Sequence, residues 1–72
     1  MVSDLDGRLL AAHAAGDRVA LIALYAEASG AAATPVARSF YLTHAYVFAL
    51  EAGTPEAPAL RARLVAMGAE VA

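Results

Sequence analysis

His13 and His44 are the residues of this chain with the most potential for acid–base or metal chemistry. A metal site needs further ligands, but the chain has no Cys, and neither histidine has an Asp or Glu three or four residues away within its predicted helix. We therefore predict no metal site and no cofactor, and interpret both histidines as ordinary packing or surface residues. A proton-sensing or partner-contacting role is the alternative for His44, which stands among aromatic residues.

Nucleophilic catalysis is also poorly supported by the sequence. It requires a Ser, Thr or Cys together with a base and a group that orients the base. Ser3 and Thr34 are better explained as helix caps, and Ser29 directly precedes a glycine. The chain contains neither a Gly-x-Ser-x-Gly motif nor a glycine-rich phosphate loop, and its length leaves little room for a substrate pocket. We predict that the protein is not an enzyme and has no catalytic residues.

Aromatic side chains gather in one segment of the sequence. Four of the five aromatic residues lie between positions 40 and 48. Aromatic residues are enriched at the energetic centres of protein interfaces, and a Tyr can bury its ring while its hydroxyl stays in water. Part of this segment is therefore a candidate interface, made up of Phe40, Tyr41, His44 and Phe48. A role in the hydrophobic core is the competing interpretation.

Glycines divide the chain into four predicted helices. Gly16, Gly30, Gly53 and Gly68 each follow a run rich in Ala or Leu, which is typical of a residue just past the end of a helix. No stretch of alternating β-branched residues competes with this interpretation. The pattern predicts helices over about residues 4–15, 18–29, 35–52 and 55–67.

The predicted helix starts carry capping signals. Ser3 and Asp17 precede the first two helices, while Thr34 and Thr54 each place a hydroxyl before a Pro, which is favoured at the first helical position. Pro58 complicates the fourth helix, because a proline in the helix interior has no N–H to donate. That helix either opens with a tight first turn or begins at Pro58.

The predicted helix over residues 35–52 differs from the other three. Its apolar residues cover the whole circumference of a helix, whereas the other helices have a narrow apolar stripe. A helix that is apolar all round is expected to be buried on all sides. The other three predicted helices are short and offer little surface to cover this one on all sides. The pattern therefore also favours a partner that covers part of this helix.

The composition places the chain among small globular proteins. It has 72 residues, a net charge of −2 and 61% hydrophobic residues, and 21 of its residues are Ala. Its hydrophobicity argues against disorder, the lack of Cys excludes a disulfide framework, and the weak positive charge argues against nucleic-acid binding. We see neither a signal-peptide pattern nor an uncharged stretch of about 20 residues, so we predict no membrane span. We expect one all-helical domain, residues 1–72, in the cytoplasm.

The helical pattern repeats along the chain. Gly16 and Gly53 are 37 residues apart, and Gly30 and Gly68 are 38 residues apart, so the order helix–Gly–helix–Gly occurs twice. A repeat of this length is typical of stacked helical hairpins. The sequence therefore predicts two αα-hairpins in series.

Several residues of the two halves resemble the pattern of the tetratricopeptide repeats: Gly16, Asp17, Leu21, Tyr25, Ala28, Ala37, Leu42, Thr43 and Tyr46. Leu21 and Thr43 depart from it, because the family prefers Ala and Gly at these places. The helix after Tyr46 is also about one turn too long for the strict repeat, which the related Sel-type repeats accommodate better. The resemblance implies a protein-binding scaffold without catalysis of its own.

The fold class predicted by the sequence is all-α, with four short helices arranged as two αα-hairpins, either tetratricopeptide-like or as a small bundle. We expect a small non-enzymatic protein–protein interaction or oligomerisation module. The expected partner is a second copy of the chain, as a homodimer, or another protein, and neither nucleic acid nor a membrane. The alternative is a helical carrier of a small ligand or apolar cofactor, with a pocket lined by Tyr41, His44 and Phe48.

Overall fold

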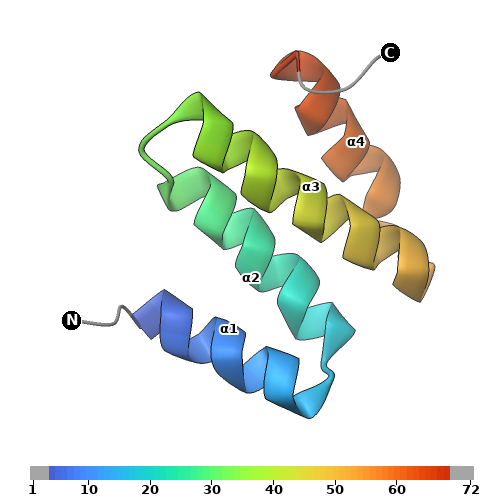
Figure 1. Cartoon of the computed structure of the whole chain (residues 1–72). Helices are drawn as coiled ribbons and strands as arrows, with labels where there is room; N and C mark the ends of the chain where they lie inside the picture. Colours follow the sequence, from blue (N-terminus) through green and yellow to red (C-terminus); the bar gives the residue numbers. More distant parts are fainter. Residues whose placement is uncertain (1–3, 69–72) are drawn as a thin grey trace.

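The computed structural model describes residues 4–68 and is all-helical over that range, with no strand. Its helices are α1 (Asp4–Ala15), α2 (Arg18–Ala31), α3 (Pro35–Ala52) and α4 (Ala57–Ala66) (Figure 1). They form the two predicted αα-hairpins, α1 with α2 and α3 with α4. Across residues 4–68, no helix combines the length and the apolar character needed to cross a membrane.

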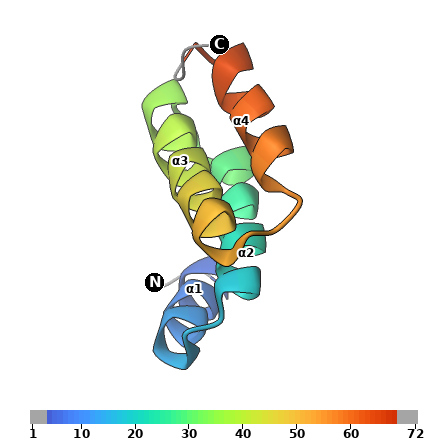
Figure 2. The same cartoon turned by 90° about the vertical axis from the view of Figure 1, so that its right-hand side faces the viewer.

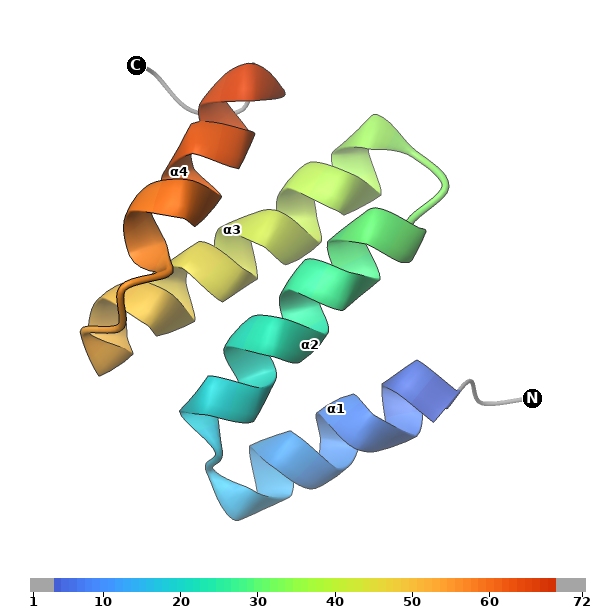
Figure 3. The same ribbon diagram turned by 180° about the vertical axis from the view of Figure 1, so that it is seen from behind.

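The four helices lie side by side in chain order, each packed against the next (Figures 1 and 3). The Cα trace extends 35 × 29 × 11 Å, so the protein is flat. Figure 2 shows the layer from the side, with α4 set toward the side of α3 that also faces α2. A flat array leaves a large part of each helix surface uncovered by the rest of the chain.

The turns within the two hairpins are built in the same way. At the first, the N–H of Asp17 donates to the carbonyl of Ala12 at 3.0 Å; at the second, the N–H of Thr54 donates to the carbonyl of Ala49 at 3.1 Å. Both turns contain a glycine with a left-handed backbone, Gly16 at φ 66° and Gly53 at φ 67°. This bonding satisfies the last carbonyls of a helix and favours glycine, because a side chain disfavours positive φ. The same turn thus recurs 37 residues along the chain.

Two of the predicted N-caps are confirmed. The Asp17 carboxylate accepts a hydrogen bond from the N–H of Ala20 at 3.1 Å, and the Thr34 hydroxyl accepts one from the N–H of Ala37 at 3.1 Å. Each side chain satisfies one of the N–H groups that the first turn of a helix leaves unpaired. The predicted cap at Ser3 lies outside the described residues.

Two helix boundaries need correction. Gly30 does not end α2, which continues to Ala31, and Gly30 has no positive φ. Of the two starts left open for the fourth helix, the structure comes within one residue of a start at Pro58: the N-cap is Glu56, the helix begins at Ala57, and Pro58 occupies its first turn. The missing N–H of Pro58 is tolerated there because the first N–H groups of a helix have no partner inside the helix.

The core is divided into two small clusters of buried side chains. The larger one joins three helices and includes Ile22 of α2, Leu42 of α3, and Leu60 and Leu64 of α4. The smaller one joins α1 and α2 through Ala12, Leu21 and Leu24. Both clusters lie within the layer, between neighbouring helices, rather than in the centre of a closed bundle.

The rest of the chain covers only part of α3. One side, with Leu42, Ala45 and Ala49, is completely buried. The opposite side faces solvent in the single chain, since Phe40 is 56% exposed and Leu50 is 55% exposed. A flat array gives α3 neighbours on part of its circumference, and none of the helices within residues 4–68 covers the rest.

Candidate functional site

An exposed apolar stripe runs along the whole of α3 on the side away from the core. We call it the outer stripe and define it as Val36, Phe40, Thr43, Val47 and Leu50. Its residues are separated alternately by four and three positions, the spacing that keeps side chains in line along a helix and forms the seam of a coiled coil. Its four large apolar side chains expose 79%, 56%, 43% and 55% of their surface, in chain order.

The polar side chains on and beside the outer stripe are already hydrogen-bonded within α3. The Thr43 hydroxyl donates to the carbonyl of Ser39 at 2.7 Å, and the Ser39 hydroxyl donates to the carbonyl of Val36 at 3.0 Å. The Nδ1 atom of His44 lies 2.9 Å from the carbonyl oxygen of Phe40, which it reaches as a donor. Covering this face would therefore leave none of these three bonds broken, so burial costs less than for unpaired polar groups.

The outer stripe also carries no charge, since no charged residue occurs between positions 39 and 50. Of the charged side chains at its ends, Arg38 turns away and donates from Nε to the carbonyl of Ala32 at 3.0 Å. Glu51 lies 4.0 Å from Arg18 of α2, measured from carboxylate oxygen to Nε. The chemistry of the stripe is that of an apolar contact surface.

The predicted interface residues divide between two surroundings. Phe40 belongs to the outer stripe, whereas Tyr41, His44 and Phe48 are half-buried against α2. There the ring of Tyr25 stacks on that of His44, with centroids 5.1 Å apart, and on that of Phe48, 5.7 Å apart. Phe40 connects the two groups, because its ring centroid is 4.4 Å from that of His44.

Tyr25 packs against all three residues that we predicted to line a ligand pocket. Its ring lies 6.2 Å from that of Tyr41, in addition to its contacts with His44 and Phe48. Aromatic rings at such separations pack directly against each other. These rings therefore join α2 to α3.

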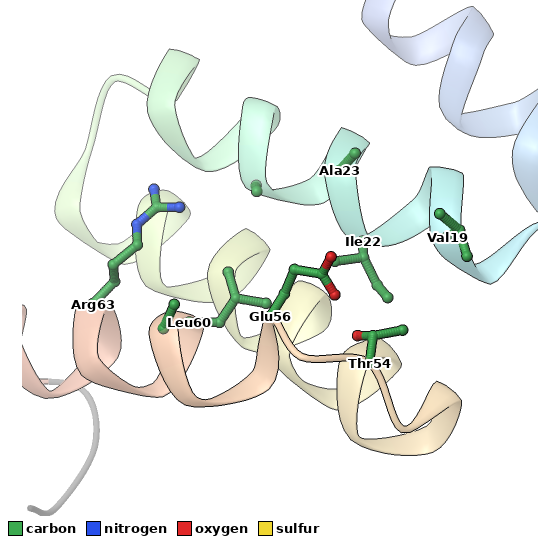
Figure 4. A pocket seen from close by; sticks show the side chains of 9 residues that line it. Val19, Ile22, Ala23, Thr54, Glu56, Leu60 and Arg63 are labelled. Carbon is green, nitrogen blue, oxygen red and sulfur yellow. The ribbon is translucent and has the colours of Figure 1, made fainter.

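A groove with a volume of about 340 Å³ lies between α2 and α4 (Figure 4). Its walls are mostly small or aliphatic and include Ile22 and Ala23 of α2 and Leu60 of α4. Figure 4 shows Arg63 toward one end of the groove and Thr54 toward the other. An apolar groove with a few polar groups at its margin is a common form of small-molecule site.

Two polar groups at this groove interact. The Thr54 hydroxyl is buried and completes no hydrogen bond of good geometry with the described residues. It nevertheless lies close enough to the Glu56 carboxylate to hold the pKa of Glu56 below its ordinary value, with help from the backbone N–H of Glu56 itself. Glu56 is thus stabilised in its charged form at the margin of an apolar groove.

Charged residues elsewhere have structural partners. Arg8 of α1 makes two hydrogen bonds to the Glu27 carboxylate of α2, at 2.9 and 3.1 Å, and this pairing raises the pKa of Arg8. Within residues 4–68 no three His, Asp or Glu side chains come together in a way that could hold a metal ion.

Sequence reasoning missed four of the five outer-stripe residues, because it weighted aromatic type above spacing. The signal was present: positions 36, 40, 43, 47 and 50 follow the alternating four–three pattern. The pattern is hard to recognise because α3 is apolar on its other sides too, so no polar face sets the stripe apart.

Comparisons with protein-family models, with curated proteins and with solved structures give no match to this chain.

Proposed function

We propose that this chain is a small, non-enzymatic interaction module of the cytoplasm, which binds protein through the outer stripe of α3. The observation that carries the proposal is the exposure of four large apolar side chains in one uncharged line: Val36, Phe40, Val47 and Leu50. The largest apolar patch on a monomeric protein, typically about 300–600 Å², is often a binding surface.

The size of the chain supports the same proposal. A domain of this size buries only about 60% of the surface of its unfolded chain, and its stability is correspondingly marginal. Burying the outer stripe against a partner adds apolar burial that the flat array does not supply. Association thus stabilises the fold, and the fold in turn keeps the stripe straight and exposed.

The resemblance to tetratricopeptide or Sel-type repeats is part of this proposal. Two hairpins in series, joined internally by the same glycine turn at Gly16 and Gly53, support it. Stacked repeats bury their faces against neighbours, and two units alone have few neighbours. A module of this type acts by binding rather than by catalysis.

The concentration dependence of thermal unfolding tests the proposed function. A partner that binds only the folded state raises the melting temperature by mass action, so a self-associating chain melts at higher temperature as its concentration increases. We expect this rise for the wild-type chain between micromolar and near-millimolar concentration. We expect Phe40→Glu and Val47→Glu to abolish it, because each places a charge within the stripe.

Leu10→Glu is the matched control. Leu10 is 67% exposed and lies on α1, outside the outer stripe, so the same charge change should leave the concentration dependence intact. If the wild type and all three variants melt at temperatures independent of concentration, and Phe40→Glu is no more soluble than the wild type, the stripe is not a binding surface.

Ligand binding in the groove between α2 and α4 is the second candidate function. It is favoured by the buried Thr54 hydroxyl, which lacks a complete hydrogen bond, and by the apolar walls around it. A thermal-shift screen of small apolar molecules bearing a polar end group tests it. A rise of several degrees that Ala23→Leu removes by filling the groove supports a carrier; no rise with any compound rejects it.

A further inference from the structure

We infer that the partner of the outer stripe is a second copy of this chain, with the two α3 helices packed antiparallel about a two-fold axis close to Thr43. This inference rests on the proposed function and adds the identity of the partner and the orientation of the contact. Homodimers with two-fold symmetry use the same surface on both copies, so the surface must be complementary to itself. The outer stripe meets this requirement in its position and its side-chain sizes, and the charge of Glu51 beside it is compatible with such a pair.

The position of the stripe suits a two-fold axis. Helix α3 runs from Pro35 to Ala52, and Thr43 stands next to its midpoint. An axis there overlaps most of the length of both helices, and the seam spacing of four and three residues keeps the two stripes in contact along it. The contact then extends over a large part of the roughly 27 Å of an 18-residue helix.

The side-chain sizes favour the antiparallel orientation. With the axis close to Thr43, the two Thr43 side chains face each other, the large Phe40 ring of each copy lies opposite the smaller Val47 of the other, and Val36 lies opposite Leu50. Large residues facing small ones let two helices interlock without voids. In a parallel pair, the two Phe40 rings would face each other and crowd the seam.

The charges favour the same orientation. Glu51 lies in the last turn of α3, where the helix dipole disfavours a negative charge. In the antiparallel pair it comes near the amino end of the partner's α3, where the dipole and the unpaired N–H groups favour that charge. A parallel pair would instead bring the two Glu51 carboxylates near each other.

The exposed area is of the size of a weak dimer contact. With roughly 150–250 Å² for a large side chain, the exposed fractions of the four apolar stripe residues amount to about 400 Å² per copy. Met67 extends this surface, because it is 40% exposed and lines a surface hollow together with Val36 and Ser39. Two copies together thus approach about 1,000 Å², the lower bound for a specific interface, so we expect a weak dimer that forms at high concentration.

Single-cysteine variants of the full chain test the inference, because the natural chain has no cysteine. A disulfide requires the two Cα atoms to approach within about 7 Å. Under mild oxidation with diamide, we expect most of the Thr43→Cys chain to form a disulfide-linked dimer. Val36→Cys and Leu50→Cys should each stay monomeric on a non-reducing gel when oxidised alone, and should link to each other when mixed.

Leu10→Cys is the control for collisional cross-linking, since Leu10 is exposed but lies on α1. Circular dichroism of each variant verifies that the helices are retained. If every stripe variant links to itself, the helices are parallel, and the inference is overturned while the proposed interaction function stands. If folded Thr43→Cys links no more than Leu10→Cys and the wild type shows no concentration-dependent melting, both proposals fail.

Discussion

The Nε2 atom of His13 lies 2.8 Å from the hydroxyl oxygen of Tyr25, which ties the end of α1 to the middle of α2. The two rings also meet edge to face, with centroids 5.8 Å apart, and the His13 ring lies 6.1 Å from that of Phe48 on α3. Tyr25, together with Phe48, therefore packs against both core clusters. Its ring and its hydroxyl make separable contributions.

Replacement of Tyr25 separates these contributions. Tyr25→Phe keeps the ring and removes the hydrogen bond to His13, so we expect the free energy of unfolding to fall by about 1 kcal/mol. Tyr25→Ala also removes the ring from its half-buried place, and we expect a loss of at least about 2 kcal/mol. Urea unfolding followed by circular dichroism measures both. Equal losses for the two variants would mean that the ring contacts contribute little.

Replacing Gly30 and Gly53 by Ala should change the stability of the fold in opposite directions. Gly30 lies within α2 with open space around the position of an added Cβ atom, so Gly30→Ala should stabilise the fold by up to about 1 kcal/mol. Gly53 has a φ of 67°, so Gly53→Ala should destabilise it by about 1–2 kcal/mol, although space is open there too. Thermal unfolding of the two variants checks this contrast. A fall in stability for Gly30→Ala would show that α2 ends before Gly30.

The pKa of Glu56 predicts how stability responds to acid. Because the Thr54 hydroxyl lowers this pKa in the folded state from an ordinary value of 4.5, the charged carboxylate stabilises the fold above that pH. The stabilisation is lost as pH falls through the lowered folded pKa. We expect Glu56→Gln to melt below the wild type at neutral pH and to approach it as the pH falls below 4.5 and then through the lowered pKa of the folded state.

Thr54→Val is the companion variant for this prediction. It removes the hydroxyl but keeps the carboxylate, so the pKa of Glu56 should rise toward its ordinary value, as measured by NMR titration of the Glu56 side chain. An unchanged pKa in this variant would assign the shift to the backbone N–H of Glu56 instead.

Much of the fold could be predicted from local signals. Asp17 and Thr34 are helix caps with side-chain oxygens, and Gly16 and Gly53 tolerate the left-handed backbone that ends a helix, so these positions mark boundaries within a few residues. Such signals act between near neighbours in the chain and depend little on tertiary packing. Gly30 misled the prediction because a glycine can also occupy a helix interior, at a modest cost in stability.

The exposed surface could not be predicted in the same way. Which side of α3 is covered depends on where α2 and α4 pack, and α3 is apolar on every side, so its own sequence does not distinguish core from surface. Tyr41 and Phe48 are of residue types that are common at interfaces, but in this structure they pack against Tyr25. Phe40 lies only one residue from Tyr41, yet it faces solvent because 100° of helical rotation separates the two.

The mass of the intact chain in solution is the most direct test of self-association through α3. Light scattering during size-exclusion chromatography, repeated over a series of loading concentrations, gives this mass without labels or variants. We expect a value that rises toward twice the 7.3 kDa of one chain as the concentration increases. A constant mass of 7.3 kDa at every concentration, with the helical circular dichroism of a folded chain, would contradict it.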